Sequence, residues 1–112
     1  MSNRNPLTVK DDPAVIFAAL GDPTRLQLVF RLRDGESHSI SALSAGLQLS
    51  RQGVTKHLRV LQRAGLVRAS KAGRESHFRH VPEQLSQAKT YLEQISLQWE
   101  DALSRLKTYV EG

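Results

Sequence analysis

The chain has 112 residues, of which 39% are hydrophobic, and it carries a formal net charge of +5 without a single cysteine. This length suits one domain, no stretch approaches the roughly 18 apolar residues of a membrane span, and the N-terminus lacks the apolar core of a signal peptide. The absence of cysteine excludes disulfides, thiolate metal sites and thiol redox sensing. We expect a cytoplasmic protein with no membrane partner, in which a flexible arm of residues 1–11 precedes a single domain of residues 12–112.

Two short helices are predicted at the start of this domain. Asp12 and Asp22 each stand directly before a proline, and aspartate at the N-cap followed by proline at the first helical position is a common helix start. The first helix is expected to end at Gly21, and the second to run to the polar stretch 34–36. The second helix is apolar on nearly every side, so we expect it to be central in the fold.

A helix-turn-helix pattern follows. The sequence predicts a short third helix over residues 39–46 and, after a turn, a fourth helix over residues 51–64 with Ser50 as its N-cap. Gly65 and the apolar Leu66 after it match a Schellman-type helix end. Beyond this stop, residues 67–81 form two predicted strands around a basic tip, the pattern of a small β-hairpin.

No helix breaker interrupts the rest of the chain, residues 82–111. A helix of this length, about 45 Å at 1.5 Å per residue, exceeds what a domain of this size covers. We therefore interpret its apolar stripe as a dimer interface; the alternative is a helix packed wholly against its own domain. The stripe has alternating spacings of three and four residues, a heptad seam, formed by Leu85, Ala88, Leu92, Ile95, Trp99, Ala102, Leu106 and Tyr109 and widened by Leu103 and Val110.

The excess positive charge lies in one segment. Residues 51–80 hold eight basic side chains against one acidic side chain, a net +7, whereas residues 1–50 sum to zero and residues 81–112 to −2. Concentrated positive charge on a helix and an adjoining ribbon is what a polyphosphate partner requires. For any one of these residues a solvated surface charge is the alternative. Their coincidence with a helix-turn-helix pattern favours double-stranded DNA as the partner.

The fourth helix divides into two faces. Val54, Leu58 and Leu61 share one face by helical spacing and are expected to pack against the second and third helices. The opposite face presents glutamine, lysine and threonine, which can pair with adenine, guanine and thymine edges in the major groove. Serines near the helix starts and the basic hairpin tip supply phosphate contacts. The candidate DNA-binding residues are Ser39, Ser41, Ser50, Arg51, Gln52, Thr55, Lys56, Arg59, Lys71 and Arg74.

Four other side chains have two possible roles each. His57 lies on the fourth helix, and we interpret it as a packing or capping residue at the edge of the core instead of a base reader. Phe17, Tyr91 and Trp99 are candidates for an effector pocket between the terminal helices. A structural role at the interface is the favoured interpretation, because aromatic residues at seam spacing usually lie in a core.

Three motifs make the family recognisable. LGDPTRL at residues 20–26, LSRQGVTKHLRVLQRAGLV at 49–67 and GRE at 73–75 resemble the ArsR family of winged-helix repressors, and the order of elements matches from about residue 12 to the end. The resemblance implies a homodimer formed by the first and last helices that binds an inverted-repeat operator and is relieved of repression by an effector. It places dimer contacts on Ile16, Phe17, Leu92, Ile95, Trp99, Leu103 and Leu106.

The sensory half of the family's function does not transfer to this sequence. Metal-sensing members use a cysteine motif in the helix-turn-helix, or histidine and carboxylate ligands on the last helix. Here residues 38–43 contain no cysteine and residues 82–111 contain no histidine. A nitrogen–oxygen site that uses His38 with carboxylates stays open. We assign no metal and no cofactor, and the effector is unknown.

Two other classes of function are alternatives to a DNA-binding regulator. The sequence has no nucleophile–base pair, no glycine-rich phosphate loop and no paired carboxylates in a plausible pocket, so we do not expect an enzyme. A winged-helix protein-interaction module that no longer binds DNA specifically is the alternative to a DNA-binding regulator. The charge of residues 51–80 argues against that module, because a protein-binding descendant has no reason to keep it.

Overall fold

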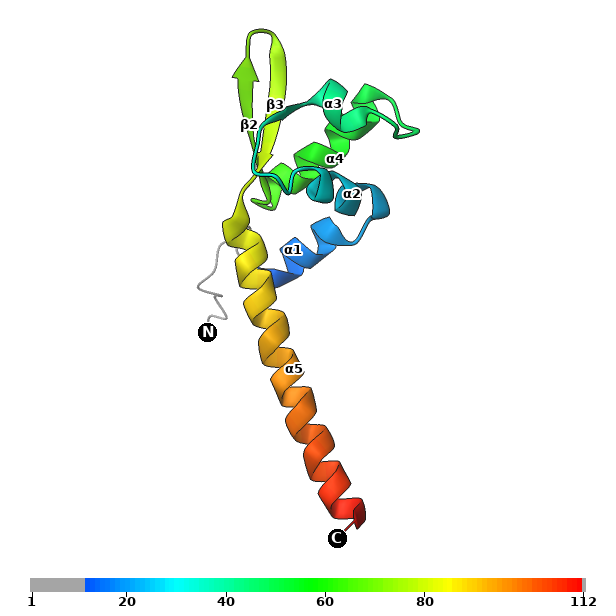
Figure 1. Ribbon diagram of the computed structural model, residues 1–112, viewed down its shortest axis with the longest axis vertical. Coiled ribbons are helices and arrows are strands. Elements are labelled where there is room, and N and C mark those ends of the chain that lie inside the picture. Colours follow the sequence, from blue (N-terminus) through cyan, green and yellow to red (C-terminus); the bar gives the residue numbers. More distant parts are fainter. Residues whose placement is uncertain (1–11, 112) are drawn as a thin grey trace, which may run out of the picture.

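The computed structural model describes residues 12–111. Four helices and a β-hairpin form a head, from which one long helix projects (Figure 1). This is a mainly α winged helix-turn-helix with five helices, as predicted. In chain order the elements are α1 (Pro13–Leu20), α2 (Pro23–Arg31), β1 (His38–Ser39), α3 (Ile40–Ser44), α4 (Arg51–Arg63), β2 (Val67–Ala72), β3 (Glu75–His80) and α5 (Pro82–Glu111).

Side-chain N-caps start the first four helices, at the predicted Asp12, Asp22 and Ser50 and also at Ser39, which was expected inside the third helix. The Asp12 carboxylate accepts a hydrogen bond from the Ala14 N–H at 2.9 Å, and the Asp22 carboxylate accepts two from the first turn of α2. Ser39 and Ser50 act in the same way, with their hydroxyl oxygens accepting from backbone N–H groups of α3 and α4. Each cap satisfies donors that a helix start leaves unpaired, so the boundaries follow from local sequence.

The core lies between α4 and the elements around it. Val54, Leu58 and Leu61 are completely buried, and α4 contacts α2 and α3 as predicted. Leu66 and Phe78 belong to the same buried cluster from the hairpin side. Burial of one such side chain stabilises the fold by roughly 1.5–3 kcal/mol. The apolar face of α4 therefore holds this helix to the head and leaves its other face in solvent.

Helix α2 is less central than its composition suggests. Leu28 is fully buried, but Leu26 and Phe30 are 53% and 61% exposed. The Arg33 guanidinium lies over the exposed Phe30 ring, 3.8 Å from its centroid. The prediction of a central helix was wrong because α2 has neighbours on one side only, and an apolar composition does not show how many neighbours a helix has.

The sheet contains a third strand that sequence reasoning missed. The two-residue strand β1 pairs antiparallel with β3, which gives the strand order β1-β3-β2. Because Ser39 is extended and paired with His77, α3 begins one residue later than predicted. It also ends at Ser44, so the third helix is shorter than the expected 39–46.

The wing strands are longer at their tip than predicted. Ala72 pairs with Glu75, so the connecting loop holds only Gly73 and Arg74. Gly73 has φ +65°, and among residues 12–111 only glycines have positive φ. This combination matches a type II′ turn, whose twist suits a tight hairpin. Beyond Val67 every residue of β2 is exposed, so the tip stands clear of the core.

Helix α5 has the predicted bounds but little cover. Only Gln84 and Ala88 in its first two turns are buried. Further along, Trp99 is 64% and Tyr109 84% exposed, and Figure 1 shows this part of the helix extending away from the head. The interpretation that α5 packs wholly against its own domain is therefore wrong for this chain.

A glycine pair tests the stop between α4 and the wing. Gly65 and Gly35 have nearly equal φ values of +78° and +79°, but a Cβ at Gly65 meets the Gln84 side chain at 3.1 Å whereas one at Gly35 meets nothing within 4 Å. Both alanine variants bear the left-handed backbone cost, about 1–2 kcal/mol. We expect Gly65→Ala to lower the free energy of unfolding more than Gly35→Ala in urea denaturation. Equal losses would contradict the packing of α5 against this turn.

Candidate nucleic-acid interface

The exposed face of α4 carries most of the predicted base-reading residues. Arg51, Gln52, Lys56 and Arg59 are all exposed, opposite the buried face of the helix. Thr55 is half-buried, and its hydroxyl donates to the Arg51 carbonyl oxygen at 2.8 Å. The structure therefore places four long polar side chains on one solvent-facing surface. Because the Thr55 hydroxyl hydrogen is already used, this side chain can offer a DNA base only its oxygen, as an acceptor, and its methyl group.

The three serines of the predicted set lie at helix starts. Ser39 and Ser50 use their side-chain oxygens as N-caps, which leaves each hydroxyl hydrogen able to donate to a phosphate. Ser41 is exposed in the first turn of α3. All three serines lie at helix N-termini, where backbone N–H groups point outward, and this position is compatible with phosphate contacts.

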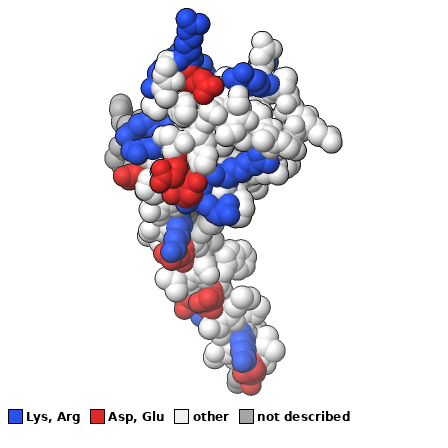
Figure 2. Space-filling model, turned by 45° about the horizontal axis from the view of Figure 1, so that its top comes forward, with Lys and Arg blue, Asp and Glu red and all other residues white. Residues whose placement is uncertain are grey.

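The wing adds basic side chains next to this helix. Lys71 and Arg74 are exposed at the hairpin tip. In Figure 2 basic side chains project from the wing and spread over the head, whereas basic and acidic side chains alternate along α5. The charge asymmetry of the sequence thus becomes a division between a basic head and a mixed stalk.

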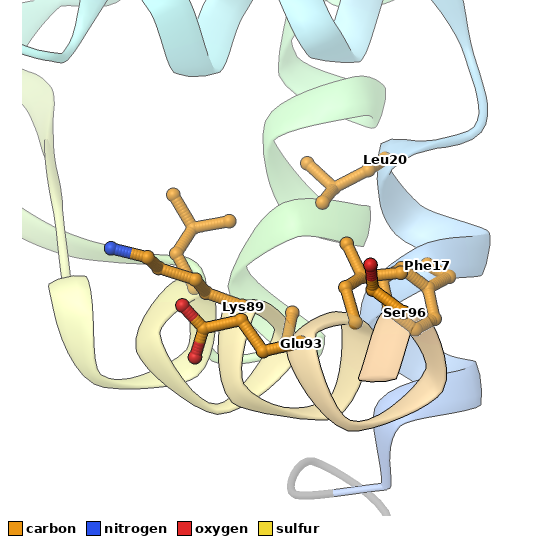
Figure 3. A pocket seen from close by; sticks show the side chains of 8 residues that line it. Phe17, Leu20, Lys89, Glu93 and Ser96 are labelled. Atoms are coloured by element: carbon orange, nitrogen blue, oxygen red, sulfur yellow. The ribbon is translucent and has the colours of Figure 1, made fainter. Parts of the chain in front are cut away.

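A hollow lies between α1 and α5 (Figure 3). The Phe17 and Tyr91 rings are tilted to each other with centroids 6.1 Å apart. The hollow is about 410 Å³ in volume, and of the three aromatic candidates only Phe17 lines it, whereas Tyr91 and Trp99 are not part of its wall. Its lining is mostly apolar and comprises Phe17, Leu20, Leu85, Ala88, Lys89, Leu92, Glu93 and Ser96.

The predicted dimer contacts differ in how much surface they offer. Leu92, Trp99, Leu103 and Leu106 are exposed, and Phe17 and Ile95 are half-buried. Ile16 was wrongly placed in this set: it is 0% exposed and belongs to the core of its own chain. On a short helix that is apolar nearly all round, the neighbouring positions 16 and 17 cannot be assigned to faces from sequence alone.

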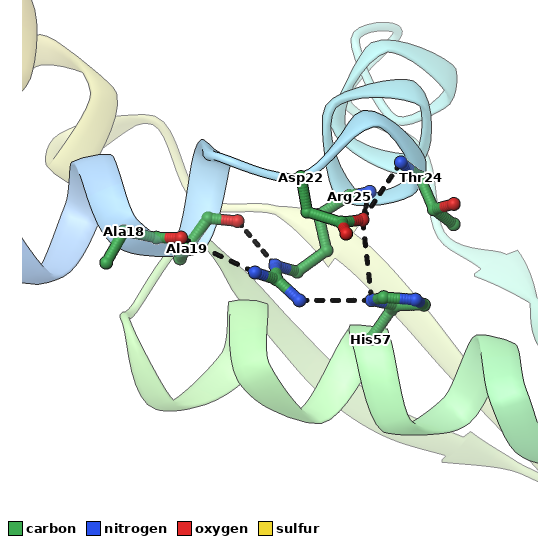
Figure 4. A network of polar contacts seen from close by, with 6 residues as sticks. All are labelled: Ala18, Ala19, Asp22, Thr24, Arg25 and His57. Atoms are coloured by element: carbon green, nitrogen blue, oxygen red, sulfur yellow. Dashed lines mark hydrogen bonds and ion pairs between the residues drawn. The ribbon is translucent and has the colours of Figure 1, made fainter.

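A polar network fixes α4 against the corner between α1 and α2 (Figure 4). The Arg25 guanidinium donates to the Ala19 carbonyl oxygen at 2.6 Å and to His57 Nδ1 at 3.1 Å. The Asp22 carboxylate lies 3.7 Å from the same ring nitrogen. His57 is thus at the edge of the core in a packing role, as predicted.

Arg25 was not identified as a positioning residue from the sequence. The only available signal was its place in the LGDPTRL motif at residues 20–26. The structure shows that Arg25, which extends from α2, joins the end of α1 to α4 through its guanidinium group. This connection sets the orientation of the recognition face relative to α1.

The chain resembles known regulators in sequence and in structure. Residues 20–69 match a helix-turn-helix domain family. An ArsR-like transcriptional regulator from Rhodococcus sp. RHA1 is 38% identical, with 86% of this chain and 90% of that chain covered and a TM-score of 0.72. This chain belongs to the ArsR family of winged helix-turn-helix transcriptional regulators.

Two relatives of the helix-turn-helix (HTH) type agree with this assignment. The HTH-type transcriptional regulator CmtR of Mycobacterium tuberculosis is 37% identical over 79 residues, which covers 70% of this chain but only 66% of CmtR. The HTH-type transcriptional repressor SmtB of the same organism is 29% identical over 98 residues, covering 88% of this chain and 70% of SmtB. These relatives are transcriptional regulators, which points to a protein that is not an enzyme.

The histidines of this ArsR-family chain do not gather into a ligand set within residues 12–111. No three histidine, aspartate or glutamate side chains of that part converge as metal ligands would. His38 Nε2 lies 2.9 Å from one Asp34 carboxylate oxygen and 3.0 Å from the other. The hydrogen bond with His38 holds the pKa of Asp34 below its usual value. In the same described part, none of the helices has the length and apolarity to cross a membrane.

The Asp22 cap predicts a pH dependence. Hydrogen bonds from the Arg25 and Thr24 N–H groups and the nearby His57 and Arg25 side chains lower the pKa of Asp22 from 3.8, the Arg25 N–H contributing most. A lowered folded-state pKa gives stability that is present above the unfolded value and lost as pH falls through the folded value. We expect Asp22→Ala to melt below wild type at pH 7, with the gap in Tm closing below about pH 3.8. A gap that did not change with pH would contradict a role for the carboxylate charge.

Proposed function

We propose that the protein is a homodimeric repressor that binds an inverted-repeat operator through α4 and the wing. The observation that carries the proposal is the exposed polar face of α4, which includes Gln52 and Lys56, together with the exposed basic tip of the wing. A helix of this kind fits the major groove, where glutamine and lysine pair with purine edges. The repressor SmtB among the relatives supports repression as the mode of regulation.

The uncovered seam of α5 supports the dimer. Leu92, Trp99 and Leu106 repeat every seven residues and are all exposed in the single chain. A second copy with the same seam can bury them, and a two-fold dimer presents its two recognition helices to successive major grooves about 34 Å apart. An operator with two inverted half-sites follows from that symmetry.

Selection of bound duplexes from a random pool, followed by titration against salt, tests the proposal. We expect recovery of an inverted repeat and a steep loss of affinity as salt rises, because phosphate contacts release counterions. Repression is then measured with a reporter that carries the selected site between promoter and gene. Enrichment of no duplex by a folded dimer would contradict the proposal and favour the protein-interaction module.

Substitutions of base-reading residues and of phosphate-contacting residues are expected to affect DNA binding in different ways. Gln52→Ala and Lys56→Ala each remove a base contact, so we expect a loss of discrimination of about 1–3 kcal/mol at one operator position. Arg74→Ala at the wing tip is the matched control. It is expected to weaken binding to all duplexes alike and to reduce the salt slope by about 1. Full operator preference in the Gln52 and Lys56 variants would overturn the assignment of α4.

The dimer seam is tested with charge on two faces of α5. Leu106→Glu places a carboxylate in the seam, whereas Ser104→Glu places one at an exposed position outside it. We expect sedimentation equilibrium to show a weakened dimer for Leu106→Glu and an unchanged dimer for Ser104→Glu, because a charge in an apolar interface is costly. Equal association of the two variants would place the interface elsewhere.

A further inference from the structure

The wing sheet has an outer face that the DNA-reading residues do not use. Side chains alternate across a strand, and directly paired residues share a face. Phe78 is buried against the core and shares its face with Ala69. The next pair, Arg79 and Arg68, therefore lies on the opposite, outward face, as does His77 with its partner Ser70.

Two arginines stand directly opposite each other on this outer face. Arg68 pairs with Arg79 in the register of β2 and β3, and both are exposed. Like charges directly opposite in a sheet are destabilising. Within residues 12–111 neither guanidinium has a hydrogen bond or an ion pair with another side chain.

The acidic residues near the arginine pair form no ion pair with it within residues 12–111: Glu83 shares a surface hollow with Arg68 but is not bonded to it. Glu75 is the one acidic residue of the hairpin strands, and its carboxylate lies 3.6 Å from His77 Nε2. It sits at the tip end of β3, four positions from Arg79. The fold thus keeps a repulsive pair that no ion pair neutralises within residues 12–111.

The surroundings of the pair indicate what the partner is. Arg68 and Arg79 line a surface hollow of about 280 Å³ together with Ser37 and Ser70. This lining offers two guanidinium groups and two hydroxyl groups and contains no carboxylate. Guanidinium groups bind phosphate oxygens in a bidentate way, and serine hydroxyls add donors. The donor set fits a phosphate group.

We propose that Ser37, Arg68, Ser70 and Arg79 form a phosphate-binding site on the outer face of the wing. If the proposed function holds, its occupant is a backbone phosphate of DNA that flanks the half-site. Lys71 lies on the other face of β2 by strand alternation, on the side of the core and α4. The hairpin then has DNA contacts on both faces, and flanking DNA reaches the outer one by bending around the wing, a deformation that depends on sequence.

Duplex length separates this site from the reading face. Affinity is measured for the selected operator alone and for the same operator extended by about one helical turn, about ten base pairs, on each side. We expect Arg68→Gln and Arg79→Gln each to weaken binding of the long duplex several-fold, with a salt slope smaller by about 1. Binding of the short duplex and base preference are expected to stay unchanged. Lys107→Gln, which removes the same charge from the far end of α5, is the control.

Inorganic phosphate provides the second arm on DNA-free protein. If phosphate raises the Tm of wild type but not of the Arg68→Gln/Arg79→Gln double variant, while duplex length has no influence, the site exists and takes a free phosphate group. If neither phosphate nor flanking DNA distinguishes the double variant from wild type, the proposal is wrong and the arginine pair is only a tolerated repulsion. Should wild type bind no duplex at all, the proposed function fails, and the phosphate arm still decides the site.

Discussion

Arg25 connects three helices through one guanidinium, and the orientation of the exposed polar face of α4 depends on that connection. Its stem leaves α2, its Nε donates to the last turn of α1, and its Nη1 reaches His57 in the middle of α4. Asp22 completes the arrangement by capping α2 and standing beside the same imidazole. Apolar packing alone permits a helix to rotate or slide, whereas hydrogen bonds at fixed angles do not. The head is therefore one unit in which the exposed face of α4 has a fixed orientation relative to α1, the helix that contacts α5.

The basic charge and the exposed apolar seam lie in separate segments of the chain. Residues 51–80 hold a net charge of +7, and α5 carries an apolar seam that is exposed in the single chain. If the two features were mixed on one surface, the charges would have to be desolvated on association, which is costly. Their separation would allow the strongly basic chain to form the proposed dimer without desolvating those charges. Arg68 and Arg79 follow the same separation, because they lie on an exposed face that no protein surface covers and that a phosphate can reach.

Local signals in the sequence were sufficient for most of the fold. Asp12, Asp22 and Ser50 cap the helices they precede, and Gly65 ends α4, because these effects involve neighbours within a few residues. Long-range features were beyond reach. The contact of Arg25 with His57 spans 32 residues, and β1 is a strand only through its pairing with β3. Faces were ambiguous where a helix is apolar all round, which is why Ile16 was misplaced and Phe30 was expected to be covered. In the candidate site, the exposed members of α4 could be foreseen from periodicity, but their precise presentation could not.

The connection between the wing and α5 is very short. One residue, Val81, separates β3 from α5, and its N–H donates to the Leu66 carbonyl oxygen at 2.9 Å. The last helix is therefore a stiff lever continuous with the hairpin, about 45 Å long. If two chains pair along α5, a small change in the crossing angle between the two α5 helices becomes a displacement of both wings. In the proposed dimer, the spacing of the two wings would thus be set by contacts along α5, far from the DNA, and would have to match the pitch of the double helix.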